Sequence, residues 1–281
     1  MSAEPQVVIH RDATLLAAAA AARLVTELVD AQSARGRAHV VLTGGGIGTA
    51  TLAAVAAAPA RDAIDWQALD VWWGDERFLP RGDPDRNATQ ARDALLDAVP
   101  LDPARVHEMP ASDDAFGSDL EAAAAWYAAQ LAAAAGPQDV TGVPSFDVLM
   151  LGVGPDGHIA SLFPSHPGLE ATDGAVIGVR ESPKPPPIRI SLTLPVIGLA
   201  RQIWLLAAGA EKADAVSTAL AQAHAQAGGP GSGSEPALPA LPAARAHGRA
   251  RTLWLLDRAA AARVSPPLVS SPLISGLRGR S

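Results

Sequence analysis

Residues 39–57 read HVVLTGGGIGTATLAAVAA and contain the chain's clearest structural signal. The segment His39–Thr43 is short, apolar and rich in β-branched residues, which predicts a strand, and Thr49–Ala57 has the composition of a helix. Three consecutive glycines, Gly44–Gly46, separate the two segments. A strand, a glycine turn and a helix in this order form the first part of a βαβ unit.

The same alternation of strand and helix signals continues in both directions along the chain. Short apolar segments predict further strands at Val7–His10, Ala68–Trp73, Phe146–Leu151, Ala175–Val179, Arg189–Leu194, Gln202–Ala207 and Thr252–Leu256. Longer stretches rich in Ala, Leu, Arg and Glu predict helices at Ala13–Arg35, Ala88–Ala98, Ser118–Ala135 and Ala213–Gln226. We therefore expect an α/β, Rossmann-like fold, in which helices cover both faces of a mainly parallel sheet and a small β region lies at the periphery.

Length and composition favour one large domain. The chain has 281 residues, of which 48% are hydrophobic, so there is ample material for a buried core. We expect residues 1–264 to form a single domain. Within it, the Gly/Ser-rich segment 228–236 predicts a surface insertion. Residues 265–281 predict a peripheral tail because they contain several prolines and show no clear period.

Composition also excludes several kinds of chemistry. The chain has no cysteine, which rules out disulfides, thiolate nucleophiles, zinc–cysteine sites and iron–sulfur clusters. A formal net charge of −7 argues against a nucleic-acid partner, and a small anionic ligand would need a local cationic pocket. Residues 1–12 lack the cationic and apolar regions of a signal peptide, so we expect a cytoplasmic protein with no membrane partner. The oligomeric state is left open.

Candidate functional residues follow the predicted strands, because open parallel sheets bind ligands beyond the carboxyl ends of their strands. The turn Gly44–Gly46, with Ile47 after it, combines close backbone approach with free N–H groups at a helix start, an arrangement that suits a phosphate group. The alternative is a tight turn that binds nothing. The turn is no Walker A loop, because no Gly-Lys-Ser/Thr follows it.

The second candidate is the segment Trp72-Trp73-Gly74-Asp75-Glu76-Arg77, where an aromatic strand ends in three consecutive charges. In extended backbone, Asp75 and Arg77 lie on one side and Glu76 lies on the other. A carboxylate and a guanidinium would then face one pocket. The alternative is a solvated charged loop.

The third candidate is the glycine-rich segment 152–158, GVGPDGH. Its glycines match the dinucleotide-binding pattern, but Pro155 and Pro164 prevent a long helix from following directly, which disfavours a nicotinamide cofactor. His158 follows the turn and would exchange protons near neutral pH, with a purely structural histidine as the alternative. Ser161 lacks a nucleophile elbow, and His158 and His166 lack a recognised metal-ligand spacing.

Two cationic residues complete the set of candidates. Arg189 begins a predicted strand soon after three consecutive prolines, and Lys212 lies at a strand-to-helix junction. Taken alone, each suits an ordinary surface charge. Together with the turn at Gly44 they would supply the local positive pocket that an acidic protein needs for an anionic ligand.

These residues together resemble the 6-phosphogluconolactonase family. The resemblance is carried, in order along the chain, by Leu42–Gly46, Gly74–Arg77 with Asn87 downstream, Leu151–His158, Ser161–Pro164, Lys184–Pro186, Arg189–Pro195, Gly209–Lys212, and Trp254–Asp257 with Ala259 and Ala260. It extends from about Val7 to Ala262, nearly the whole chain. The chain departs from the family pattern in the phosphate turn, where Gly46, Ile47 and Gly48 replace the usual Ser-Thr-Pro. Backbone N–H groups must therefore replace hydroxyl contacts.

The resemblance implies a hydrolase that converts 6-phospho-D-glucono-1,5-lactone into 6-phosphogluconate in the oxidative pentose phosphate pathway. It implies His158 as the base that activates water, Arg77 as the group that stabilises negative charge at the carbonyl, and Asp75 as an orienting carboxylate. The residues implied to hold the 6-phosphate are Gly44, Gly45, Gly46, Ile47, Arg189 and Lys212, with Arg77 as an alternative phosphate ligand. No metal, nucleotide or other cofactor is required.

Two other functions fit parts of the sequence. Glucosamine-6-phosphate deaminases share the fold and a similar Gly-Asp-Gly-His turn, but they continue with an Asn-Glu-Pro phrase where this chain has Ser161–Pro164. They also place Tyr after Asp-Glu, where this chain has Arg77. A non-catalytic sugar-phosphate sensor would bind without turnover, and the presence of His158 with Asp75 and Arg77 disfavours it.

Overall fold

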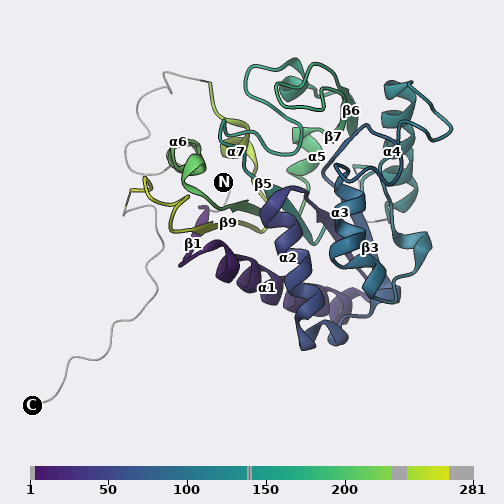
Figure 1. Ribbon diagram of the computed structural model, residues 1–281, viewed down its shortest axis with the longest axis horizontal. Helices are drawn as coiled ribbons and strands as arrows, with labels where there is room; N and C mark the ends of the chain where they lie inside the picture. Colours follow the sequence, from purple (N-terminus) through teal and green to yellow (C-terminus); the bar gives the residue numbers. More distant parts are fainter. Residues whose placement is uncertain (1–3, 138, 140, 229–238, 266–281) are drawn as a thin grey trace, which may run out of the picture.

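A six-stranded parallel sheet forms the centre of the protein (Figure 1). The computed structural model describes residues 4–137, 139, 141–228 and 239–265. In the order β1-β9-β8-β5-β2-β3, the sheet contains β1 (Gln6–His10), β9 (Arg251–Asp257), β8 (Gln202–Ala207), β5 (Val148–Gly152), β2 (Ala38–Leu42) and β3 (Leu69–Trp73). Every pair of neighbouring strands runs parallel. All their carboxyl ends therefore lie at one edge of the sheet.

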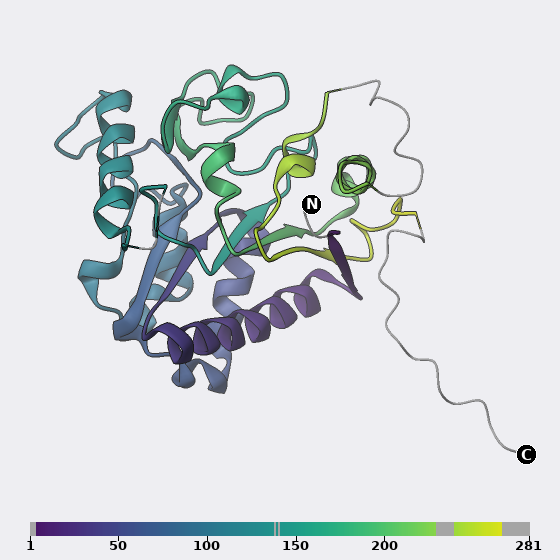
Figure 2. The same ribbon diagram turned by 180° about the vertical axis from the view of Figure 1, so that it is seen from behind.

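Helices cover both faces of the sheet because alternate strand residues point in opposite directions. Val40 and Leu42 of β2 belong to the core that includes residues of α1 (Ala13–Arg35), α2 (Gly45–Ala57) and α3 (Asn87–Ala94). Val41 belongs to the opposite core, which includes residues of α4 (Leu120–Ala134), α6 (Ala213–Gln226) and α7 (Pro242–Arg245). Figure 2 shows the two helical layers from behind.

A second, small sheet is antiparallel and supports one side of the site. Its order is β4-β7-β6, with β4 (Asp75–Arg77), β7 (Arg189–Leu192) and β6 (Val176–Val179), and a short helix, α5 (Leu194–Ile197), follows β7. Asp75 pairs with Ser191 and Arg77 pairs with Arg189. The pairing brings the charged segment after β3 against the strand that begins with Arg189.

Local signals fix the ends of the longest helix where the sequence predicts them. The Asp12 carboxylate accepts a hydrogen bond from the backbone N–H of Leu15 at 2.9 Å, which caps the start of α1. Gly36 ends the helix with φ of +76°, a left-handed conformation that glycine adopts without steric cost. The predicted bounds of α1 and α6 are confirmed.

The predicted fold class is confirmed, and the differences lie mainly at element boundaries. α2 begins at Gly45 rather than at Thr49, because extended Gly44 lets the helix start within the glycine run. The helix predicted over Ala88–Ala98 ends at Ala94, where Leu95 leaves helical backbone geometry. β4 was not predicted as a strand and forms through its pairing with β7. Short 3₁₀ helices cover Pro59–Ala63, Trp66–Ala68, Leu96–Ala98, Pro103–Arg105, Pro167–Glu170 and Ala210–Lys212.

The domain boundaries remain predictions. The expected insertion at 228–236 lies, apart from Gly228, outside the described residues, and so does the expected tail at 265–281, apart from Ser265. Within the described part of the chain, no helix has the length and hydrophobicity needed to cross a membrane.

Candidate active site

A cavity of about 230 Å³ lies at the carboxyl edge of the parallel sheet. Among the residues that line it are the predicted site residues Gly44, Gly45, Asp75, Arg77, His158, Arg189 and Lys212. Gly46 and Ile47 line a neighbouring cavity, which also includes Ala13 and Thr14 of α1. The turns after β2, β3, β5 and β8 therefore meet here, as expected for an open parallel sheet.

His158 lies on a turn that brings its ring against the carboxylate of Asp156. The imidazole Nδ1 is 2.5 Å from Asp156 Oδ1. Gly154 permits this arrangement, because a Cβ at that position would lie 2.0 Å from His158 Nδ1. The His158 ring also packs against the ring of Phe163, with centroids 4.6 Å apart. An anionic carboxylate at Nδ1 holds the proton on that nitrogen and leaves Nε2 free to accept one.

The environment of Asp156 favours its ionised form. Burial raises its pKa, but the hydrogen bond with His158 and the charges of His158 and Lys184 outweigh that effect, so the net pKa lies below its usual range. Lys184 Nζ is 3.6 Å from Asp156 Oδ1 and 3.4 Å from His158 Nδ1. Asp156 is therefore a charged partner for the imidazole at neutral pH.

Lys184 and Asp156 were not predicted as site residues, although both lie in segments that the sequence singles out. Lys184 directly precedes the prolines, and Asp156 lies two residues before His158 in the glycine-rich turn. Lys184 could have been identified from its position, because it is a cation directly before the rigid proline segment that leads to Arg189. Lys184 lines the cavity together with Pro185.

Asp75 and Arg77 both line the cavity, as the alternation of β4 predicts, and Glu76 does not. Asp75 is 6% exposed, so the alternative of a solvated loop is wrong. Asp75 Oδ2 accepts a hydrogen bond from Ser161 Oγ at 2.7 Å. Arg77 Nη1 donates to the backbone oxygen of Asp85 at 2.5 Å, while its buried Nε has no hydrogen-bond partner within the described part of the chain.

Arg189 lines the cavity, is largely buried and is extensively hydrogen-bonded. Its Nε donates to the backbone oxygen of Pro186 at 3.1 Å, and its Nη2 donates to the oxygens of Lys184 and Pro185 at 3.0 and 3.1 Å. Its Nη1 lies 4.0 Å from Asp75 Oδ2. Burial lowers the pKa of Arg189, with a partly opposing effect from Asp75. Arg189 thus connects the proline segment to Asp75.

The glycine turn and Lys212 form the other end of the cavity. Gly44 precedes α2 in extended conformation with no side-chain cap, so the first N–H groups of the helix are left without a capping side chain. Gly45 has φ of +79°, which favours glycine. Lys212 Nζ donates to the backbone oxygen of Val153 at 2.6 Å. Burial lowers the pKa of Lys212, and Glu211 partly opposes the effect.

Charge is distributed unevenly around the cavity. Arg77, Lys184, Arg189 and Lys212 line it, whereas Asp75 is the one carboxylate among its described lining residues. The positive potential expected for an anionic ligand is therefore present in a chain with a net charge of −7. Across the residues that the structure describes, no group of three or more His, Asp or Glu side chains is placed to hold a metal ion.

Known proteins resemble this chain over almost its whole length. A 6-phosphogluconolactonase of Streptomyces coelicolor is 64% identical over 264 residues, which cover 94% of this chain and 96% of that protein. A 6-phosphogluconolactonase of Mycobacterium tuberculosis is 48% identical over 91% of this chain and 97% of that protein. The solved structure of 6-phosphogluconolactonase from Trypanosoma brucei is 28% identical, with a TM-score of 0.73, and the match covers 93% of this chain and 99% of that one. The profile of the family described as glucosamine-6-phosphate isomerases/6-phosphogluconolactonase matches residues 11–254, and this chain belongs to that family.

Proposed function

We propose that this protein hydrolyses 6-phospho-D-glucono-1,5-lactone to 6-phosphogluconate, a step of the oxidative pentose phosphate pathway. One observation carries the proposal: the Asp156–His158 pair lies at a cavity lined by four cationic side chains. Such a cavity combines a base for water with a positive potential for a phosphorylated substrate. The relatives that are 64% and 48% identical to this chain bear the name of this activity. The activity is that of a hydrolase acting on a cyclic ester.

The chemistry requires an activated water, a stabilised oxyanion and a proton for the leaving oxygen. We assign the base to His158 Nε2, which takes a proton from water as the water oxygen attacks the lactone carbonyl carbon. Arg77 stabilises the resulting oxyanion. When the oxyanion collapses, the bond between the carbonyl carbon and the ring oxygen breaks, and His158 returns the proton to that oxygen. One lactone and one water thus give one hydroxy acid.

The remaining residues orient these groups and bind the substrate. Asp156 holds the His158 ring in the orientation that exposes Nε2, and Asp75 orients Ser161 and Arg189. We assign the 6-phosphate to the backbone N–H groups of Gly44–Ile47 and to Lys212. Arg189 adds positive charge, but its hydrogen bonds to the carbonyls of residues 184–186 make it chiefly a support for that segment.

The test is turnover of freshly prepared 6-phosphogluconolactone, with product formation coupled to 6-phosphogluconate dehydrogenase. We expect the enzyme to outpace spontaneous hydrolysis and to release no ammonia from glucosamine 6-phosphate. Ammonia release would indicate the deaminase reaction. Binding of 6-phosphogluconate without any turnover of the lactone would indicate a sugar-phosphate sensor.

A further inference from the structure

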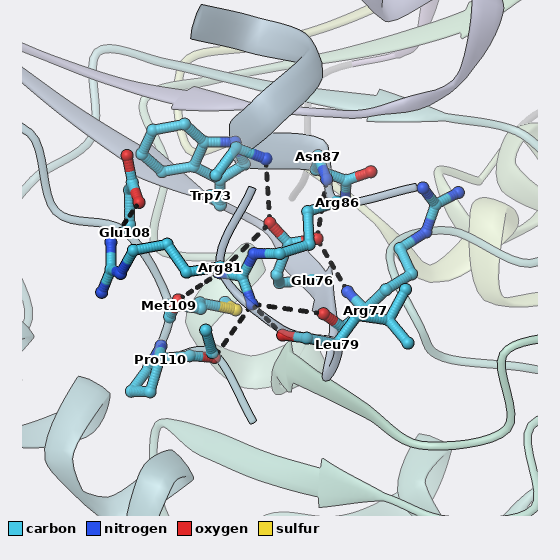
Figure 3. Close-up of polar contacts among 12 residues, drawn as sticks. Trp73, Glu76, Arg77, Leu79, Arg81, Arg86, Asn87, Glu108, Met109 and Pro110 are labelled. Atoms are coloured by element: carbon cyan, nitrogen blue, oxygen red, sulfur yellow. Dashed lines mark hydrogen bonds and ion pairs between the residues drawn. The ribbon is translucent and has the colours of Figure 1, made fainter. Parts of the chain in front are cut away.

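Glu76 belongs to β4 but does not line the cavity, and its carboxylate lies against Arg86 and the start of α3 (Figure 3). It is 1% exposed and lies between two residues that line the cavity, Asp75 and Arg77. Burying a carboxylate to this extent costs free energy of folding unless hydrogen-bond donors surround it. The donors that contact Glu76 therefore show which segments of the chain it holds in place.

The Glu76 carboxylate receives hydrogen bonds from the start of α3. Oε1 accepts from the backbone N–H of Asn87 at 2.7 Å and of Arg77 at 2.8 Å, and Oε2 accepts from the N–H of Ala88 at 2.8 Å. The residue before α3 is Arg86, whose side chain gives the helix no cap. The carboxylate of Glu76, on β4, accepts these N–H groups in place of an N-cap side chain. It therefore fixes the start of α3 to β4.

The guanidinium of Arg86 lies beside this carboxylate and is also buried. Arg86 is 2% exposed, and its Nη2 lies 3.7 Å from Glu76 Oε2. Its guanidinium donates hydrogen bonds to backbone oxygens, at 3.0 Å for Leu79, 2.7 Å for Met109 and 3.3 Å for Pro110. The Glu76–Arg86 pair is thus anchored to the backbone at Leu79, at Met109–Pro110 and at the start of α3, which makes it a rigid reference point.

Asn87, the first residue of α3, connects this reference point to both ends of the cavity. Its Nδ2 donates to the backbone oxygen of Asp75 at 2.8 Å. On the other side it packs against Gly44, where a Cβ would lie only 1.8 Å from Asn87 Oδ1. One amide group therefore contacts the strand with Asp75 and Arg77 as well as the glycine turn.

We propose that Glu76 is a positioning residue that acts through Asn87 to set the spacing between the glycine turn and the Asp75–Arg77 segment. The inference rests on the proposed function, in which the turn holds the phosphate and Arg77 faces the lactone carbonyl. The phosphate and the lactone carbonyl belong to one compact substrate. The two ends of the cavity that bind them must therefore be held at a fixed separation. A misplacement of about 1 Å lowers turnover by up to about 100-fold in well-organised sites.

The test compares two substrates, 6-phosphogluconolactone and unphosphorylated gluconolactone. The measured quantity is the ratio of kcat/KM for the first to kcat/KM for the second. Fewer folded molecules lower both values equally and leave the ratio unchanged. Loss of the spacing lowers the ratio, because only the phosphorylated lactone is anchored by the glycine turn.

Asn87→Ala removes the connecting amide but keeps the backbone N–H that bonds Glu76, and we expect it to lower the ratio about 10-fold or more. Glu76→Gln is expected to lower the ratio similarly, because its amide NH₂ would face other donors. The double variant should match Asn87→Ala alone. Asp147→Asn is the matched control. Asp147 is a buried carboxylate that accepts a hydrogen bond from the backbone N–H of His39, at the amino ends of the strands and away from the cavity. Its ratio should stay within about twofold of wild type.

An unchanged ratio in Asn87→Ala would overturn the proposal, as would a further fall in the double variant, which would show that Glu76 does not act through Asn87. If Glu76→Gln does not fold, Glu76→Asp replaces it, because the shorter side chain keeps the charge but withdraws from α3. Wild-type protein without turnover of 6-phosphogluconolactone would instead refute the proposed function, so the two failures are distinct.

Discussion

Replacing Glu76 with Gln is expected to change how the stability of the protein depends on pH. Burial raises the pKa of Glu76 from 4.5 to about 7, against the opposing effects of Arg86 and three backbone N–H groups. Between these two values the folded protein binds more protons than the unfolded chain, so the contribution of Glu76 to the free energy of unfolding falls as pH rises. Raising the pKa from 4.5 to about 7 corresponds to a total loss of about 3–4 kcal/mol, because each pH step of one between these values is worth about 1.4 kcal/mol.

The assay is urea unfolding of wild type and Glu76→Gln at a series of pH values from about 4.5 to about 7.5. Subtracting the two curves removes the titration of every other group. We expect the advantage of wild type to be largest at the acidic end and to shrink by about 2–3 kcal/mol toward the alkaline end. Glu121→Gln, which removes an exposed carboxylate, supplies the reference for losing one charge. A difference that stays flat, or that grows with pH, would refute the reasoning from burial.

Three further predictions concern the reaction. His158→Ala is expected to lower kcat by about 10²- to 10⁴-fold with the fold intact by circular dichroism, since it removes general acid–base catalysis; near-wild-type turnover would contradict its assignment. Lys212→Ala is expected to weaken binding of 6-phosphogluconate by about 1.5–3 kcal/mol in titration calorimetry, and unchanged affinity would remove Lys212 from the phosphate site. EDTA is expected to leave turnover unchanged because water activation is assigned to an imidazole, and a loss that a divalent cation restores would show that assignment to be incomplete.

The features that could be predicted are those set by interactions between residues close together in the sequence. Asp12 and Gly36 mark the ends of α1 because a cap acts on the next few residues only. The turn at Gly44 and the turn before His158 could be located because each follows a run of apolar strand residues. Parallel topology then requires both turns to lie at one edge of the sheet. No pairwise contact had to be known for that step.

The contacts that could not be predicted join residues far apart in the chain. Asn87 acts on Gly44 and Asp75, and no local pattern indicates that its side chain occupies the space of a missing Cβ. Arg189 was expected to bind phosphate, and its Nε and Nη2 groups donate to the carbonyls of residues 184–186, a set of contacts that its sequence neighbours do not reveal. Composition shows that a cation is present. Only tertiary structure shows which of its N–H groups are already bonded.

The three consecutive charges of β4 show how a buried ion pair can select the register of a functional strand. Asp75 and Arg77 face the cavity only because Glu76 faces the opposite side, and a shift of one residue would exchange the two faces. The opposite side contains the guanidinium of Arg86 and the backbone N–H groups of Asn87 and Ala88, which are all donors. A shift that moved Arg77 there would bury a second guanidinium beside Arg86 without an acceptor, at a cost of several kcal/mol. The Glu76–Arg86 pair therefore disfavours the register shift that would take Arg77 out of the cavity.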